Sequence, residues 1–595
     1  MSGEGESKAA LAEADAPEDA PPAAAAQGLD LLLLWHMHQP EYRDPVTGEF
    51  REPWVYLHAL KDYADMAAHF ERRPDMRGVV NFVPVLLDQL EDYADQFATG
   101  RLRDPLLRLL AKPDGEPFSA QERALAFAQC FNANHARLVA PYPAYARLHD
   151  LALAQGDTAS DPQGYLSDRY LSDLVTWYHL AWTGETVRRA SPLPNALMER
   201  GGGFDEASRR ALLDLVAATV TDVVPRYRRL EESGVVELTT SPAWHPLAPL
   251  LIDFASAREA QPDAELPQAP RYPGGEARVD AQIASALATH RRCFGRAPDG
   301  LWPPEGGISD AFARCVARHP LRWIASGSQV LVNSLRAAAP EDVQAASAMY
   351  RPYRLTDATP ALTCVFRDDR LSDLIGFEYR QWHSGDAAAH FVGELEAIAA
   401  AAPVDARPLV TIIVDGENAW EHYPYNGYYF LTDLYDRVAA HPTIRARTGR
   451  EIVASTDARA QAGTEAAYAL PHVVAGSWVY GDFATWIGAP DKNRAWDLLA
   501  AAKDACDDAL ANGRVAPEDR DALSRQLAVC EGSDWFWWFG DYNPADAVAR
   551  FDALYRDNLA RLYALLGLPR PAALDEPISR GSATAVSEGA IRRAA

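Results

Sequence analysis

Short, almost uninterrupted apolar runs alternate with amphipathic stretches from Leu29 to Ala440 of this chain. A run such as LDLLLLW at residues 29–35 is typical of a strand that is buried on both faces. Runs of the same kind occur at residues 79–83, 234–238, 321–325, 363–366 and 409–414. Apolar residues spaced three and four apart predict helices at 55–70, 207–232, 277–294, 387–401 and 428–440. This alternation predicts an α/β fold whose parallel sheet is closed, or nearly closed, into a barrel.

Two other regions of the chain are helical without intervening strands. Residues 101–203 read as a helical insertion within a barrel domain that spans residues 29–475. The alternation of strands and helices stops at about residue 476, and residues 476–570 are predicted to form an all-α C-terminal domain. The acidic residues 1–28 and the Ser-, Ala-, Gly- and Arg-rich end at 571–595 are predicted to be disordered tails.

The charge balance excludes two classes of partner. The chain has 57 Lys and Arg against 83 Asp and Glu, a formal net charge of −26, which repels phosphate backbones and anionic lipid surfaces. No stretch approaches the roughly 18 apolar residues of a membrane helix, and the first 28 residues lack the apolar core of a secretory signal. The six cysteines are widely separated, without metal-ligand spacing. We therefore expect a cytoplasmic protein that binds neither nucleic acid nor membranes.

Polar and aromatic clusters follow several of the predicted strands. In a parallel barrel the reacting groups lie where strands end and the following loops begin. Four clusters take such positions, and a fifth, at 532–541, lies in the helical C-terminal region. The first four are residues 35–40, 237–246, 302–307 and 415–421. If the barrel forms, these four clusters share one rim.

Glu305 has two prolines before it and two glycines after it. The prolines fix the approach of the chain and the glycines permit a tight turn, so this pattern can aim a carboxylate. Glu305 could equally be an acid placed before the helix that starts near Ser309, where the helix dipole favours negative charge. Spacing alone leaves the two interpretations even.

Asp415 ends the most continuous apolar strand of the chain, close to Glu417 and Glu421. Burial and neighbouring negative charge both raise a carboxyl pKa, which is what a general acid at neutral pH requires. A structural ion pair with an arginine is the alternative. Glu417 could face the same side as Asp415, so the assignment within this cluster stays open.

His36 and His38 are two residues apart at a strand end and are expected to project from one face. Such a pair can bind a metal or accept hydrogen bonds from hydroxyl groups. A metal would need a third ligand, for which Asp415, Glu305 or His245 could serve. No second histidine cluster has ligand spacing, so hydroxyl binding is favoured over zinc.

The aromatic block at 535–538 is flanked by Asp534 and Asp541. Aromatic faces stack on the C–H faces of sugar rings, while carboxylates bind sugar hydroxyls. Packing of the helical domain onto the barrel is the other explanation of these rings, and most of the four are expected to serve it.

Taken in order, the five clusters resemble the motifs of glycoside hydrolase family 57, which includes amylopullulanases, α-amylases and 4-α-glucanotransferases. The resemblance extends from Leu31 to Tyr542, and residues 366–373 and 476–478 resemble the amylopullulanase-like branch. It implies an incomplete (β/α)7 TIM-like barrel and a helical C-terminal domain that completes the substrate groove. It also implies retaining cleavage of α-1,4-glucans, with α-1,6 bonds as a further option, without metal or cofactor. The implied roles are nucleophile for Glu305, acid/base for Asp415, and sugar binding for His36, His38, Glu237, Arg367, Trp420, Asp534 and Trp537.

One departure from the family pattern affects specificity. Family members often carry an Asp-Glu pair where this chain has Ser326-Gly327-Ser328. The departure affects a subsite contact and thus the exact specificity. Hydrolysis and transfer to another sugar both stay open, because the choice depends on loop positions and groove polarity. Retention predicts carboxyl groups about 5–5.5 Å apart. Two other classes remain: a zinc-dependent carbohydrate hydrolase, of α-mannosidase or deacetylase type, and a non-catalytic glycan-binding protein.

Overall fold

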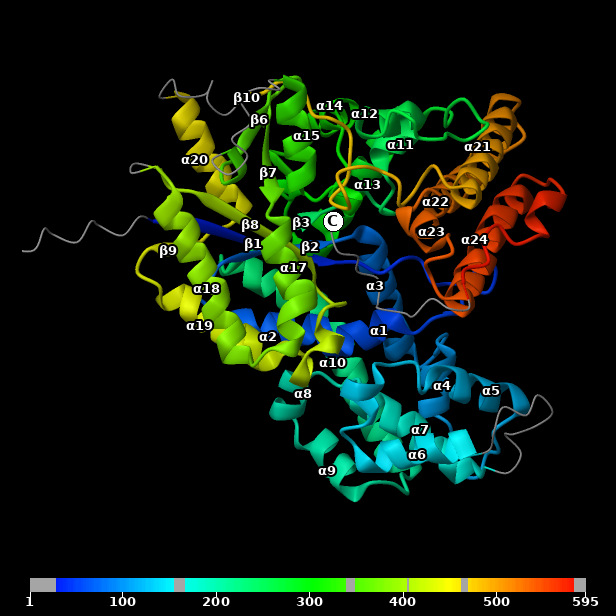
Figure 1. Cartoon of the computed structure of the whole chain (residues 1–595). Coiled ribbons are helices and arrows are strands. Elements are labelled where there is room, and N and C mark those ends of the chain that lie inside the picture. Colours follow the sequence, from blue (N-terminus) through cyan, green and yellow to red (C-terminus); the bar gives the residue numbers. More distant parts are fainter. Residues whose placement is uncertain (1–27, 155–165, 339–347, 404–405, 462–468, 583–595) are drawn as a thin grey trace, which may run out of the picture.

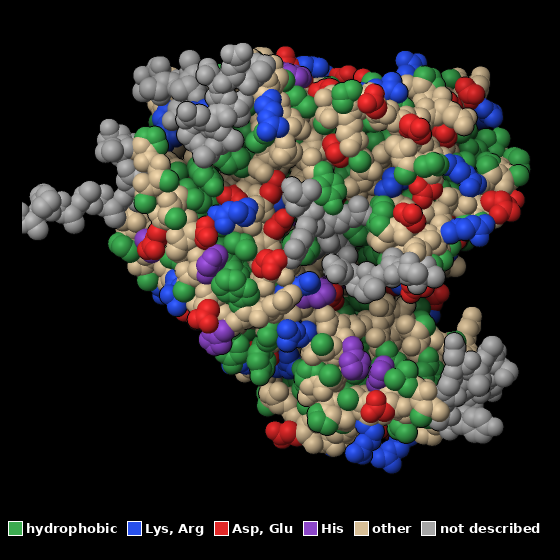
Figure 2. Space-filling model, viewed as in Figure 1, with side chains coloured by type: hydrophobic (Ala, Val, Ile, Leu, Met, Phe, Trp, Pro, Cys, Tyr) green, Lys and Arg blue, Asp and Glu red, His purple; other side chains and the backbone are tan. Residues whose placement is uncertain are grey.

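The computed structural model describes residues 28–154, 166–338, 348–403, 406–461 and 469–582. A central sheet is surrounded by helices, with a helical lobe below it and a second group of helices beside it (Figure 1). On the face seen in Figure 2, acidic and basic side chains are interspersed over the surface. Among the described helices, none is both long and apolar enough to cross a bilayer.

Seven parallel strands form the core of the sheet. Their spatial order is β8 (Leu409–Asp415), β1 (Leu29–Met37), β2 (Gly78–Phe82), β3 (Val236–Thr240), β4 (Gly300–Leu301), β5 (Trp323–Gly327) and β7 (Leu362–Arg367). Three short strands extend it: β6 (Tyr353–Leu355) is antiparallel to β7, β10 (Ala469–Leu470) pairs with β6, and β9 (Ile444–Ala446) pairs with β1. No ladder joins β7 to β8 in the described ranges, although the amide of Asp368 donates to the carbonyl of Thr411 at 2.8 Å. The α/β architecture is therefore confirmed, and no ladder of the described residues closes the sheet into a barrel.

Alternation along the buried strands separates two apolar cores. On β1, Leu31 and Leu33 face the surrounding helices, whereas Leu32 and Leu34 face the interior of the sheet together with Trp323. Because side chains alternate along a strand, the next interior position after Leu34 is His36. A polar layer therefore begins where the apolar interior ends.

The helices fall into three groups, as Figure 1 shows. Those around the sheet are α1 (Trp54–His58), α2 (Ala64–Arg72), α3 (Pro84–Thr99), α10 (Glu206–Glu232), α11 (Ala248–Ile252), α12 (Ala257–Ala260), α13 (Gly275–Phe294), α14 (Asp310–Ala317), α15 (Ser328–Ala338), α17 (Asp369–Asp373), α18 (Ser384–Ala401), α19 (Tyr428–Ala440) and α20 (Gly449–Gln461). The insertion between β2 and β3 holds α4 (Pro105–Leu110), α5 (Ala120–Gln129), α6 (Pro143–Ala154), α7 (Asp168–Ala181), α8 (Glu185–Ala190) and α9 (Pro192–Arg200). The C-terminal group is α21 (Pro490–Ala511), α22 (Arg520–Cys530), α23 (Ser533–Trp538) and α24 (Ala545–Leu565).

The structure corrects the expected C-terminal tail. Residues 571–582 are part of the fold: Asp552 on α24 accepts the amide of Ile578 at 2.6 Å, and the Ser579 hydroxyl accepts the amide of Gly540 at 3.0 Å. The segment therefore packs against α24 despite its polar composition. The expected tails at 1–27 and 583–595 lie outside the described residues.

Candidate active site

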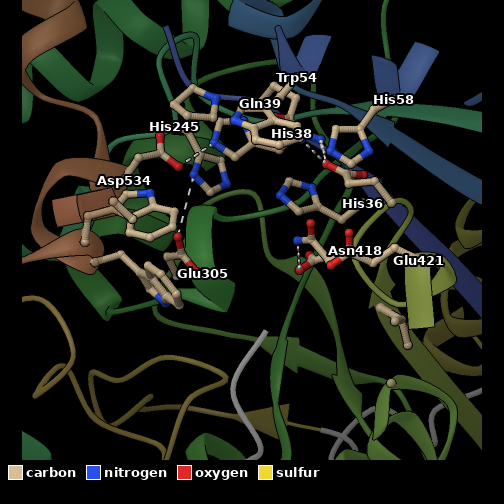
Figure 3. A pocket seen from close by; sticks show the side chains of 18 of the residues that line it. His36, His38, Gln39, Trp54, His58, His245, Glu305, Asn418, Glu421 and Asp534 are labelled. Carbon is tan, nitrogen blue, oxygen red and sulfur yellow. Dashed lines mark hydrogen bonds and ion pairs between the residues drawn. The ribbon is translucent and has the colours of Figure 1, made fainter. Parts of the chain in front are cut away.

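A cavity of about 370 Å³ opens at the carboxyl ends of the parallel strands. Barrel loops, the insertion and the C-terminal helices all contribute to its lining. Figure 3 shows side chains from the barrel loops and the C-terminal helices, such as Glu305 and Asp534. Glu305 and Asp415 both line it, although 110 positions separate them in the chain. All five clusters that the sequence singled out contribute side chains to this cavity. The cluster at 237–246 contributes His245 alone.

Glu305 is held by a strained turn after β4. It has φ 60°, in the left-handed region, a conformation that costs a non-glycine residue about 1–3 kcal/mol. The turn is fixed from outside, because the carbonyl of Glu305 accepts the amide of Trp478 at 3.0 Å. Its carboxylate Oε1 accepts the hydroxyl of Ser533 at 3.0 Å, and Nδ1 of His245 lies 3.8 Å from the same oxygen. Barrel and C-terminal helices together therefore aim this carboxylate into the cavity.

Asp415 occupies the last position of β8, in register with His36 on β1. His36 is in register with Asn81, which is in register with Thr239, so these side chains form one layer across the sheet. Oδ2 of Asp415 accepts the side-chain amide of Asn418 at 3.2 Å. The sheet register therefore places the Asp415 carboxyl at the floor of the cavity.

Burial shifts the pKa values of both acids upward. Desolvation, reinforced by the negative charges of Asp534 and Asp415, raises the pKa of Glu305 to about 8. Desolvation raises the pKa of Asp415 to about 6, while the Asn418 hydrogen bond acts in the opposite direction. Between about pH 6 and pH 8 these shifts leave one proton on the pair, held mainly by Glu305.

Glu417 lines the same cavity but is already committed to the backbone of the β1 loop. Its Oε1 accepts the amide of His38 at 3.1 Å and the side chain of Gln39 at 3.2 Å. Burial and the charge of Asp415 hold its pKa well above the usual range. Asp415, whose one recorded bond among the described residues comes from Asn418, is therefore the better placed of the two for proton transfer to a ligand.

Three imidazole rings stack beside the acids. The centroid of His245 lies 3.9 Å from that of His38 and 5.1 Å from that of His36. Nε2 of His38 lies 2.8 Å from Asp534, which fixes the proton on that nitrogen and leaves Nδ1 as an acceptor without a recorded partner. Ser533 has one hydroxyl proton; if it donates to Glu305, then His245 donates to Ser533 through Nδ1 at 3.0 Å and its Nε2 is left as an acceptor. The free ring nitrogens of His38 and His245 can therefore accept hydrogen bonds from sugar hydroxyls.

His38, His245 and Asp534 are also the one group in the described part of the chain whose ligand atoms converge enough for a metal, within 4.8 Å of one another. The rings of His38 and His245 are nearly parallel, at 22°. The ring-nitrogen lone pairs of stacked imidazoles lie in parallel planes and do not point at one common position. Zinc needs its nitrogen ligands to point at one position from about 2.0–2.1 Å. This arrangement suits separate hydrogen bonds to a polyol better than one ion.

Of the seven expected sugar-binding residues, five line the cavity: His36, His38, Arg367, Asp534 and Trp537. Arg367 is held in place by Asp369 at 2.7 Å, Asp373 at 2.9 Å and the carbonyl of Ile413 at 2.8 Å. Its guanidinium is thus a fixed positive charge at the cavity wall.

Glu237 does not line the cavity. It lies two positions before Thr239 on β3, one layer below the cavity, and is fully buried. Its Oε1 accepts the indole N–H of Trp323 at 2.9 Å and its Oε2 accepts the amide of Arg450 at 2.6 Å. Glu237 therefore binds Trp323 and the backbone of Arg450 inside the sheet, away from the cavity.

Trp420 is likewise a core residue. It is fully buried, its indole N–H donates to the carbonyl of Gly416 at 2.9 Å, and its ring packs edge-on against Trp35. The loop after β8 turns this ring inward, so it does not line the cavity.

Other cavity residues were not predicted. Several follow no strand: Trp54 and His58 on α1, Asn132, Asn134 and Trp182 in the insertion, and Arg550 and Phe551 on α24. Trp478 was quoted for its resemblance but received no role. Their sequence offered little to identify them beyond aromatic and amide side chains in segments to which no role was assigned.

Ser533 gives a prediction about pH dependence. The reaction needs one proton on the Glu305–Asp415 pair. We therefore expect kcat/KM to fall below about pH 6, where both acids are protonated, and above about pH 8, where both are ionised. The Ser533→Ala variant loses a hydrogen bond that favours ionised Glu305, so the pKa of Glu305 rises and the alkaline limb moves to higher pH. We expect maximal kcat/KM to fall about 10- to 100-fold. Ser533→Thr, which keeps the hydroxyl, should restore both; an unshifted alkaline limb in Ser533→Ala contradicts this role.

Residues 32–466, well over half of the chain, match the model of glycosyl hydrolase family 57. The chain belongs to this family. A 96-residue segment, 16% of this family 57 chain, is 31% identical to a 1,4-alpha-glucan branching enzyme of Thermococcus kodakarensis, of which it covers 11%. The expected family is therefore confirmed, and this family 57 member is an enzyme.

Several solved structures share the fold. A branching enzyme from Pyrococcus horikoshii aligns with a TM-score of 0.54 at 15% identity, over 90% of this chain and 89% of that one. The α-amylase AmyC from Thermotoga maritima aligns with a TM-score of 0.52 at 14% identity, over 91% and 93% of the two chains. At these identities the likeness concerns the architecture of the sheet and its helices.

Proposed function

We propose that this family 57 enzyme cleaves α-glucosidic bonds of α-glucans by double displacement and passes the glycosyl group to water or to a sugar hydroxyl. The carrying observation is that Glu305 and Asp415 line one cavity, each with a raised pKa. Printed activities of relatives, a 1,4-alpha-glucan branching enzyme and an α-amylase, support α-glucans as the substrate class. The α-1,4 bond is the primary target, with α-1,6 bonds as the further option.

In the first step the Glu305 carboxylate attacks the anomeric carbon. The bond from that carbon to the glycosidic oxygen breaks, and Asp415 gives its proton to the departing oxygen. In the second step Asp415 takes a proton from water or from an acceptor hydroxyl, whose oxygen then displaces Glu305. The configuration at the anomeric carbon is retained because it is inverted twice.

The sugar at the reacting position is held by polar groups around Glu305. Asp534 and the free ring nitrogens of His38 and His245 accept hydroxyl protons, and Trp537 offers a ring edge or face at the cavity wall. Arg367 supplies positive charge at the cavity wall, where it acts on Asp415. We also infer a cytoplasmic setting, supported by six cysteines that are all buried and unpaired.

Product analysis tests this proposal. After incubation with maltooligosaccharides, amylopectin and pullulan, shorter sugars alone indicate hydrolysis, and longer ones appearing as well indicate transfer. Activity should survive chelator treatment. No product from any α-glucan with folded enzyme contradicts the proposal, and loss to chelator that zinc restores points instead to His38, His245 and Asp534 as a metal site.

A further inference from the structure

The cavity has a second part, beyond Asp415, that the proposed chemistry at Glu305 does not use. In Figure 3, His245, Asp534 and Glu305 lie on one side, whereas Asn418, Glu421 and His58 lie on the other. Asn418 is hydrogen-bonded to Asp415, so Asp415 belongs to this second side. We call its far wall the acceptor arm, which consists of Trp54, His58, Asn132, Asn134, Trp182 and His422.

The positions of Glu305 and Asp415 along the substrate determine which sugar faces the arm. Glu305 must face the anomeric carbon, and Asp415 must face the oxygen that joins this sugar to the next one. Groups beyond Asp415, as seen from Glu305, therefore face the sugar that leaves. By the reverse of the same step, they face the sugar that arrives as acceptor.

Rings and unpaired polar groups line the arm. Trp54 and Trp182 have ring centroids 5.7 Å apart, and His58 packs edge-on against Trp182 at 5.6 Å. The indole N–H of Trp182 is buried and has no hydrogen-bond partner among the described residues. Aromatic walls match the C–H faces of a sugar ring.

The helical insertion supplies the polar side of the arm. The Asn134 amide N–H lies 3.0 Å from Nδ1 of His422, and Arg137 Nε donates to the carbonyl of His422 at 3.0 Å. These bonds fasten the insertion to the loop that follows Asp415. Asn132, two residues before Asn134, also lines the cavity, and its side-chain amide has no recorded hydrogen-bond partner among the described residues.

We propose that the acceptor arm binds the glucosyl unit on the leaving and acceptor side, and that the insertion thereby determines how much of the glycosyl-enzyme is transferred to sugar rather than to water. Asn132 contacts acceptor hydroxyls and Trp54 supplies a stacking face. Asn134 and Arg137 are positioning residues that hold His422 at the wall. This inference rests on the proposed function, because it needs a glycosyl group on Glu305.

A donor without a sugar leaving group separates the arm from the acids. α-Maltosyl fluoride releases fluoride when Glu305 attacks, so the initial burst of fluoride reports the first step, whereas steady-state release also depends on the second step. Maltotriose added at increasing concentration then competes with water for the intermediate. The share of longer products gives the acceptor concentration at half-maximal transfer.

Asn132→Ala and Trp54→Ala should each raise that concentration roughly fivefold or more, since each removes a hydrogen bond or a stacking face. The half-maximal acceptor concentration is read from the product ratio within each variant, so a change in that variant's rate of fluoride release does not affect it. Asn512→Ala, an exposed amide on the C-terminal region, is the matched control and should leave both quantities unchanged.

Unchanged acceptor curves in both arm variants overturn the proposal, as does a wild-type enzyme that releases fluoride but transfers to no concentration of maltotriose. Failure of the proposed function looks different, because a wild-type enzyme without glycosidase chemistry releases no fluoride.

Discussion

Glu305→Gln is expected to lower the cleavage of maltooligosaccharides by about 10⁴-fold or more while leaving their binding in place. The substitution keeps the size and hydrogen-bonding shape of the side chain, including an oxygen that can accept from Ser533. It removes the charge that attacks the anomeric carbon, and an amide is a very weak nucleophile. Cleavage rate and oligosaccharide affinity, measured on the same folded variant, check the two halves of this expectation.

The control for this variant is Glu276→Gln, which changes a surface carboxylate on α13 that pairs with Arg318. Its activity should equal that of the wild type. Folded Glu305→Gln protein with cleavage within tenfold of the wild type would remove Glu305 from the reaction.

Asp415→Asn is expected to lose about 10²- to 10⁴-fold in activity on natural glucans, because Asn cannot give a proton to the leaving oxygen. Cleavage of α-maltosyl fluoride should suffer much less in its first step, since fluoride departs without protonation. The second step then limits turnover, because no base activates water. Azide, which needs no base, should speed turnover and yield an α-glycosyl azide.

Glu417→Gln is the matched control for Asp415→Asn. Glutamine retains an acceptor oxygen for the amide of His38 and the side chain of Gln39, so we expect only a small loss. If Glu417→Gln lost activity as Asp415→Asn does, and azide rescued Glu417→Gln instead, the acid/base role would pass to Glu417.

The parts of the fold predicted best were those with a strong local pattern. The apolar runs of β1 and β8 stand out because both faces of each strand are buried, and this burial also predicted that Asp415 ends a core strand. In contrast, β4 has only two residues and β10 has two, too few for any periodicity. The prolines and glycines around Glu305 left two interpretations even, and its expected role came from the family resemblance.

Glu237 shows why a cluster after a strand is not enough. Its placement depended on which residue of β3 reaches the rim, and register with β2 puts Thr239 rather than Glu237 at that level. A shift of two residues preserves the face but moves the side chain one layer deeper. Register across strands is a tertiary property that no run of residues displays.

The insertion shows a second limit. Asn132 and Asn134 enter the cavity because helices distant in sequence dock on the loop after β8 through Arg137 and His422. Nothing in their local sequence marks them, since asparagine in a loop is most often a turn residue. Similarly, the polar composition of residues 571–582 predicted disorder, whereas the carboxylate of Asp552 binds the backbone of Ile578 and Ser579.

The central claim, that Glu305 becomes covalently glycosylated, is tested most directly by trapping. A 5-fluorinated α-glucosyl fluoride slows both steps, and a good leaving group lets the intermediate accumulate. Mass spectrometry of a tryptic digest should then show one added glycosyl group on the peptide of residues 297–314, with fragmentation placing it on Glu305. An adduct on another residue, or inactivated enzyme whose peptide 297–314 is unmodified, would contradict the account.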